Sequence, residues 1–231
     1  MIDKLIEYFE TFVNANRKAT INKTLEYRTR YLTVVLEDIF QTHNVSAVIR
    51  TCECFGIQDV HIIENRNRYQ LNPKVALGAE QWLTIVRHRG KNNNTAEALN
   101  KLKAQGYRIV AATPHNENID LDNFNFQKGK IALVFGTELQ GISDLVYNMA
   151  DEYIKIPMYG FTESFNISVS VALIVHHLIS KLHKSQIKWQ IAGKEKKRLK
   201  LEWLKNSVKK PDLIEKYFLE NIYKKNKRKI K

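Results

Sequence analysis

Segments with the composition of buried strands alternate with segments of helical periodicity between residues 31 and 182. The strand-like segments are short aliphatic runs, such as YLTVVLEDI (31–39) and KIALVFG (130–136). The helical segments carry apolar residues three and four positions apart, as in HNVSAVIRTCECFG (43–56). Strands that alternate with helices predict βαβ units, in which helices cover both faces of a mostly parallel sheet. We therefore predict an α/β fold.

The pattern predicts where the strands and helices of this region begin and end. Strands are expected at residues 31–39, 59–63, 83–88, 107–113, 130–136 and 152–158. Helices are expected at residues 43–56, 95–106, 142–150 and 167–182, with Thr95 as the N-cap of the second helix.

The two ends of the chain lie outside this alternation. Residues 1–16 show the spacing of an amphipathic helix, whereas residues 17–31 are polar and basic and are predicted to be a connector. Two more helices are expected at residues 190–206 and 211–227. The predicted parts of the chain are an N-terminal helical extension (1–30), a central domain (31–182) and a basic helical extension (183–231).

The positive charge of the chain is concentrated near its C-terminal end. The formal net charge is +13, yet residues 1–180 contain 19 Lys and Arg against 19 Asp and Glu. Residues 181–231 contain 18 Lys and Arg against 5 Asp and Glu. Such a segment is typical of proteins that bind the backbone of a nucleic acid. A solvated tail and a contact with anionic membrane are the alternatives.

Other features argue against secretion, membrane insertion and metal binding. The first residues, MIDKLIEYFETFV, mix charges among apolar side chains, unlike a secretory signal. The longest apolar run, within Ile167–Ile179, is too short to span a bilayer. Cys52 and Cys54 are separated by one residue, and the histidines show no metal-ligand spacing. We expect a cytoplasmic protein without a metal.

Three polar motifs follow predicted strands, where ligands bind in open parallel sheets. They are THNVSAVIR (42–50), VFGTELQGIS (134–143) and IPMYGFTESFNISV (156–169). Each has a plain structural alternative. Asn44 could be only an N-cap and Arg50 only a surface charge, and the second motif could be an ordinary turn between strand and helix. In the third, Ser164 or Asn166 could simply cap the apolar helix that follows.

Together the motifs resemble those of the SpoU (TrmH) family of SPOUT methyltransferases. The family forms are N-x5-R, G-x-E-x-x-G-[IV]-S and IPM…S-x-N-x-S-[VT], and all three are intact here. The resemblance spans residues 30–182. It implies an α/β sheet with a C-terminal deep trefoil knot at about residues 130–180. It also implies a homodimer whose active site lies near the subunit interface.

The resemblance implies an enzyme that uses S-adenosylmethionine to methylate a ribose 2′-hydroxyl in tRNA, most closely a guanosine of the D-loop. The short N-terminal extension and the basic C-terminal extension favour this target. Ribosomal RNA or another tRNA position is the first alternative, and a catalytically silent RNA-binding protein on the same fold is the second.

The resemblance also assigns roles to individual residues. The catalytic residues would be Asn44, Arg50, Glu138, Ser164 and Asn166, and the cofactor-binding residues would be Thr113, Gly136, Ile156, Met158 and Phe165. The basic extension adds candidate RNA contacts at Lys194, Lys196, Lys197, Arg198 and Lys200. The family assigns activation of the hydroxyl to the residue at Arg50. Because arginine stays protonated, we expect Arg50 to hold a phosphate and to stabilise the developing alkoxide.

Overall fold

The computed structural model describes residues 1–90, 93–114, 119–138 and 140–228, except for the side chains of residues 222–228. Contacts within the chain define two compact units. Residues 29–189 form the first, which we call the α/β unit. Residues 1–28 and 190–231 form the second, which we call the helical unit.

The α/β unit is built on a seven-stranded sheet in which every described pairing is parallel. The strand order is β3-β2-β1-β6-β4-β7-β5. The strands are β1 (Leu32–Glu37), β2 (Asp59–Ile63), β3 (Thr84–His88), β4 (Arg108–Ala112), β5 (Ile119–Asp120), β6 (Ile131–Phe135) and β7 (Glu152–Lys155).

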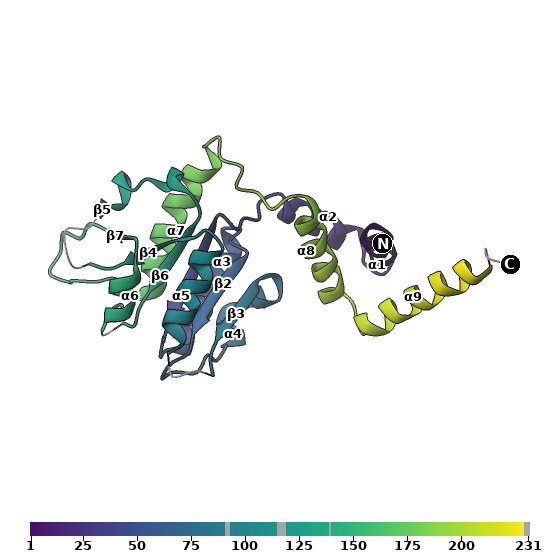
Figure 1. The fold of residues 1–231 in the computed structure, drawn as a ribbon, viewed down its shortest axis with the longest axis horizontal. Coiled ribbons are helices and arrows are strands. Elements are labelled where there is room, and N and C mark those ends of the chain that lie inside the picture. The colour runs from purple at the N-terminus through teal and green to yellow at the C-terminus, as the bar shows by residue number, and fades with distance from the viewer. Residues whose placement is uncertain (91–92, 115–118, 139, 229–231) are drawn as a thin grey trace. The chain divides into compact units, whose positions relative to one another are not determined.

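Helices cover both faces of this sheet, as predicted (Figure 1). On one face, α3 (Thr42–Cys54) and α7 (Ile167–His183) pack on alternate residues of β1, such as Val34 and Leu36. On the other face, α5 (Asn94–Ala104) and α6 (Asp144–Met149) pack on the side that carries Val35. The period-two alternation of side chains along β1 separates the two layers. A short helix, α4 (Pro73–Ala76), packs against α3.

The strand order determines which loops meet at the carboxyl edge. β6 lies between β1 and β4, and β4 lies between β6 and β7, although these strands are far apart in the sequence. The residues that follow β1, β6, β4 and β7 are therefore neighbours. The second and third motifs lie largely in these loops, and the first motif lies in α3, which begins directly after the loop that follows β1.

Some boundaries differ from the prediction. β7 ends at Lys155, so residues 156–158 follow the strand instead of closing it. Thr95 is not the N-cap of α5; Asn93 is, through a hydrogen bond of 3.1 Å from the Ala96 N–H to its side chain. β5, with two residues, was not predicted.

The helical unit joins both ends of the chain. Its helices are α1 (Ile2–Glu10), α2 (Ala15–Leu25), α8 (Gly193–Asn206) and α9 (Pro211–Arg228). α1 and α2 both pack against α8, around buried Phe9, Leu25 and Trp203. The prediction of a connector at residues 17–31 was wrong, because most of α2 lies there. No helix in the described parts of the chain combines the length and apolar character needed to cross a bilayer.

Candidate active site at the carboxyl edge of the sheet

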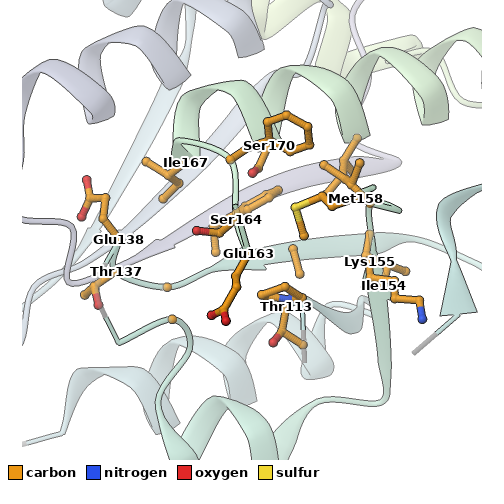
Figure 2. Close-up of a pocket in the computed structure, with 18 of the residues that line it drawn as sticks. Thr113, Thr137, Glu138, Ile154, Lys155, Met158, Glu163, Ser164, Ile167 and Ser170 are labelled. Carbon is orange, nitrogen blue, oxygen red and sulfur yellow. The ribbon is translucent and has the colours of Figure 1, made fainter. Parts of the chain in front are cut away.

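A cleft opens over the ends of β4, β6 and β7 (Figure 2). It contains about 990 Å³ of space not filled by atoms, its open mouth included. All five residues that were expected to bind a cofactor line this cleft: Thr113, Gly136, Ile156, Met158 and Phe165. The structure therefore brings together residues from three different strand ends.

The walls of the cleft combine apolar and polar side chains. Phe135, Ile154 and Ile174 contribute apolar surface. Glu138 and Ser164, expected to be catalytic, also line it. A planar apolar group with hydrogen-bonding edges would fit such a surface.

The loop after β6 is closed tightly by its own backbone. The Thr137 N–H donates to the Gly141 carbonyl at 2.8 Å, and the Gly141 N–H donates back to the Thr137 carbonyl at 3.0 Å. A Cβ on Gly136 would lie 1.9 Å from the Gly141 oxygen, so only glycine fits there. Gly141 has φ +68°, a conformation that favours glycine. The two glycines of the second motif thus give this loop its shape.

Asn44 joins the three motifs. Its side-chain Nδ2 donates to Glu138 of the second motif and, at 3.0 Å, to the side chain of Gln41. Its Oδ1 accepts a hydrogen bond of 3.1 Å from Nδ2 of Asn166, in the third motif. Asn44 is buried inside α3, whose N-cap is Gln41, so the interpretation of Asn44 as an N-cap is wrong.

Asn166 caps α7 and also hydrogen-bonds Asn44. It is the N-cap of α7, with Oδ1 accepting hydrogen bonds from the Ser168 N–H at 2.9 Å and the Ser168 hydroxyl at 2.6 Å. Its Nδ2 remains for Asn44. The capping alternative therefore holds for Asn166. Ser164 does not cap α7 and lines the cleft (Figure 2).

Arg50 lies apart from the other predicted catalytic residues. It is exposed on α3, nearly two turns beyond Asn44, and does not line the cleft. Among the described residues it has no hydrogen-bond or ion-pair partner. Its guanidinium is thus available to a group from outside the α/β unit.

The sequence analysis missed several residues at this site. Glu163 reaches into the cleft from the loop before α7, and Lys155 and Ser170 also line it (Figure 2). Lys155 is 3.7 Å from the Asp120 carboxylate. Glu163 stood next to the recognised motif, but solvation of a loop explained it equally well. No sequence signal marked Lys155 or Ser170.

The candidate RNA contacts fall into two groups within the helical unit. Lys196, Lys197 and Lys200 form ion pairs with Glu26, Asp3 and Glu10, at 2.7, 2.6 and 2.7 Å. The Lys197 ammonium, which hydrogen-bonds the carboxylate, lowers the pKa of Asp3. Lys194 and Arg198, by contrast, are exposed and have no partner in the described part of the chain.

Comparisons with known proteins all point to the same family. The sequence model of the SpoU rRNA methylase family matches residues 31–176. The chain is 45% identical over 212 residues to the tRNA (guanosine(18)-2′-O)-methyltransferase of Borreliella burgdorferi, covering 92% of this chain and 95% of that protein. It is 32% identical to the Escherichia coli K12 protein of the same name, covering 71% of this chain and 69% of the relative.

A solved structure shares most of the fold. The crystal structure described as the A. aeolicus TrmH/SpoU tRNA modifying enzyme aligns with a TM-score of 0.74 at 26% identity. The alignment covers 84% of this chain and 98% of the other.

Proposed function

The chain belongs to the SpoU methylase family, and on that basis we propose that it methylates tRNA. The reaction is transfer of a methyl group from S-adenosylmethionine to the ribose 2′-hydroxyl of a D-loop guanosine, the guanosine 18 named for its relatives. One observation carries this proposal: 45% identity to such an enzyme over 92% of the chain. The matched length includes segments of both units.

The cleft has the chemistry that S-adenosylmethionine requires. Its adenine is flat and apolar with hydrogen-bonding edges, which suits walls of Ile154, Ile156 and Phe165 beside exposed loop backbone. The glycine at position 136 keeps the loop backbone at the cleft surface free of a side chain. Thr113, Gly136, Ile156, Met158 and Phe165 would hold the cofactor.

When bound, the cofactor supplies an activated methyl group on a positively charged sulfur. The chain's own contribution is alignment of the ribose hydroxyl with that methyl group. Glu138 and Ser164 face the cleft and would orient the ribose. Asn44 holds Glu138 and Asn166 in fixed positions, which limits movement of the second and third motifs.

Arg50 would contact the RNA and not the cofactor. An exposed, unoccupied guanidinium suits a phosphate, which it can bind with two parallel hydrogen bonds. Held beside the target ribose, it would also stabilise negative charge that develops on the 2′-oxygen.

A second copy of the chain would complete the assembly. α7 is apolar nearly all round, and it leaves Val169 and Leu173 more than 40% exposed in the single chain. We propose that these residues face the partner in a homodimer, which brings Arg50 towards a site at the interface. Sedimentation of the wild type and of Leu173→Glu tests this, since a wild-type monomer would exclude it.

The family's trefoil knot is proposed at about residues 130–180. Small-angle scattering of the denatured chain tests this, because a knot that persists would keep the denatured chain more compact.

The helical unit would grip the tRNA backbone. Residues 1–28 and 190–231 carry 20 Lys and Arg against 9 Asp and Glu, whereas residues 29–189 carry 17 against 15. Lys194 and Arg198 are the predicted contacts whose charge is not already paired within the described residues. A cytoplasmic location fits a tRNA substrate.

Ribosomal RNA is the second candidate substrate, because the matching family is described as an rRNA methylase family. A transfer assay separates the candidates. The purified protein is incubated with methyl-labelled S-adenosylmethionine and either unmodified tRNA or unmodified ribosomal RNA. Label in tRNA supports the proposal, and label only in ribosomal RNA supports the alternative. Binding of tRNA without label would identify a silent RNA-binding protein.

A further inference from the structure

Glu37 is a buried carboxylate to which the proposed reaction gives no role. It is the last residue of β1 and is 4% exposed. A buried carboxylate is costly unless hydrogen bonds compensate for its lost hydration. Its partners therefore indicate why it is there.

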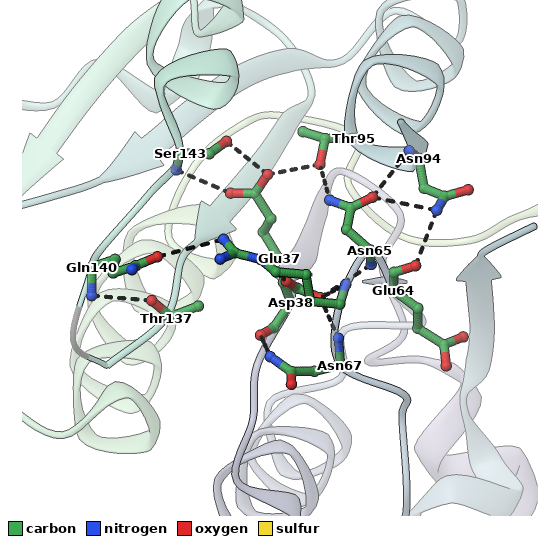
Figure 3. Close-up of polar contacts among 11 residues, drawn as sticks. Glu37, Asp38, Glu64, Asn65, Asn67, Asn94, Thr95, Thr137, Gln140 and Ser143 are labelled. Atoms are coloured by element: carbon green, nitrogen blue, oxygen red, sulfur yellow. Dashed lines mark hydrogen bonds and ion pairs between the residues drawn. The ribbon is translucent and has the colours of Figure 1, made fainter. Parts of the chain in front are cut away.

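Within the described part of the chain, Glu37 accepts hydrogen bonds from two residues. Oε1 accepts from the Ser143 hydroxyl at 2.8 Å and from the Thr95 hydroxyl at 2.7 Å. Oε2 accepts from the Ser143 backbone N–H at 3.1 Å. Figure 3 shows the carboxylate between Ser143 and Thr95. Ser143 is thus held by both its backbone and its side chain.

Ser143 is the point where the second-motif loop ends. It is the N-cap of α6, and its hydroxyl accepts a hydrogen bond of 3.2 Å from the Val146 N–H. The loop before it starts at Gly136 and carries Glu138, and both line the cofactor cleft. Glu37 therefore ties the far end of this loop to the carboxyl end of β1.

The next residue, Asp38, fixes a neighbouring loop in the same way. Its φ is +57°, and its Oδ1 accepts hydrogen bonds from the backbone N–H groups of Asn65, Arg66 and Asn67, at 3.1, 2.7 and 2.8 Å. The Arg66 guanidinium in turn lies 3.5 Å from the Gln140 side-chain oxygen. A polar network thus links Asp38 to the second-motif loop through Arg66 and Gln140.

We propose that Glu37 is a positioning residue for cofactor binding. Through Ser143 it holds residues 136–138 and 140–143 in the arrangement that lines the cleft and places Glu138 against Asn44. A carboxylate suits this position because all three groups that contact it, on Ser143 and Thr95, are donors. Glutamine would turn an N–H group towards one of these donors and leave a buried hydrogen bond unmade. The inference rests on the proposed function, since it concerns the S-adenosylmethionine site.

The first test compares Glu37→Gln with Glu64→Gln. Glu64 is a matched control, because it is also buried and directly follows β2, but it accepts hydrogen bonds from Arg87 and Tyr69 instead of from the second-motif loop. Calorimetry measures the Kd for S-adenosylmethionine and for S-adenosylhomocysteine. Glu37→Gln should weaken both by on the order of tenfold. Glu64→Gln should lower the thermal midpoint while leaving both Kd values at the wild-type level.

Two further measurements separate positioning from general stability. Hydrogen exchange without cofactor should show faster exchange at the Ser143 amide in Glu37→Gln, with core strands unchanged. Ser143→Ala alone should weaken cofactor binding, and the double variant should lose less binding free energy than the sum of the two single losses, because both substitutions remove the same contact.

These results can overturn the proposal independently of the function. Wild-type affinity in Glu37→Gln, or strictly additive losses in the double variant, would contradict it. If Glu37→Gln does not fold, wild-type affinity in Ser143→Ala would contradict it instead. A wild-type protein that binds neither ligand contradicts the proposed function, while the exchange result still tests the link between Glu37 and the loop.

Discussion

At the residue scale, Arg50 differs from the other predicted catalytic residues, because it neither lines the cleft nor takes part in the hydrogen bonds that link Asn44, Glu138 and Asn166. The junction of Asn44 with Glu138 and Asn166 holds the other motifs together, so the chain itself orders them. Arg50 has no such support among the described residues. Contacts with the RNA or with a second subunit must therefore hold the Arg50 side chain in place. Its role is the one that most needs an experimental test.

Single-turnover rates of Arg50 variants across pH distinguish the possible roles. If Arg50 holds a phosphate and stabilises the alkoxide, Arg50→Ala should slow methyl transfer by on the order of 10²–10³-fold. Arg50→Lys should retain part of the rate, and both should keep the shape of the wild-type pH profile. Cofactor affinity is the control and should not change, because Arg50 does not line the cleft. An ionisation near neutrality that vanishes in both variants would show that Arg50 acts as a base.

The predictability of the site also differs from residue to residue. Gly136, Glu138, Ser164 and Asn166 could be found because polar residues and glycines stood out at a strand end or before an apolar helix. Glu37 could not, since a carboxylate at the end of an aliphatic strand is ambiguous until its partners are known. Thr95, more than 50 residues away, becomes its neighbour only in the folded sheet.

At the scale of helices and strands, packing decided what local pattern could not. The buried strands could be predicted because short aliphatic runs of their length are typical of strands inside a sheet. α2 was missed because it is mostly polar, with Ile21 and Leu25 as its buried residues. Its packing against α8, about 170 residues later in the chain, supplies what the local sequence lacks.

α8 carries cations that form ion pairs within the chain and cations that do not. Substitution of each kind should show which of them bind tRNA. Lys194→Ala with Arg198→Ala should weaken tRNA binding and reduce the salt slope by up to about 2, since each phosphate contact contributes about 0.9. Lys197→Ala with Lys200→Ala removes the same charge but breaks the ion pairs with Asp3 and Glu10. This control should leave the salt slope nearly unchanged. Equal slopes for the two double variants would contradict the assignment.

The neighbouring strands β2 and β3 carry a histidine pair that should make stability depend on pH. His61 Nδ1 lies 3.0 Å from His88 Nε2, and burial, with a smaller effect from His88, lowers the pKa of His61 from 6.5 to about 4. At pH values between about 4 and 6.5, His61 binds a proton in the unfolded chain but not in the folded chain. The free energy of unfolding therefore falls as the pH falls.

Urea unfolding at pH 7 and pH 5 measures this effect. The His61 contribution should lower the free energy of unfolding by about 2 kcal/mol at pH 5 relative to pH 7. His61→Gln, which is neutral at both values, should reduce the pH difference by about that amount. The same pH difference in the variant and the wild type would contradict this account.

At the scale of the whole molecule, charge and chemistry are divided between the two units. The α/β unit is nearly neutral and contains the cleft, while the helical unit holds most of the positive charge. Because α1 and α2 pack on α8, truncation before α8 would uncover Phe9 and Leu25. Charge substitutions therefore probe RNA binding more cleanly than truncation.

The most direct test of the central claim is the position and chemistry of the methyl group. An unmodified tRNA transcript is treated with the purified protein and S-adenosylmethionine and then mapped by nuclease digestion and mass spectrometry. We expect one methyl group, on the ribose of guanosine 18, and no product when that nucleotide is 2′-deoxyguanosine. A methyl group on a base, or transfer that persists with the deoxynucleotide, would contradict it.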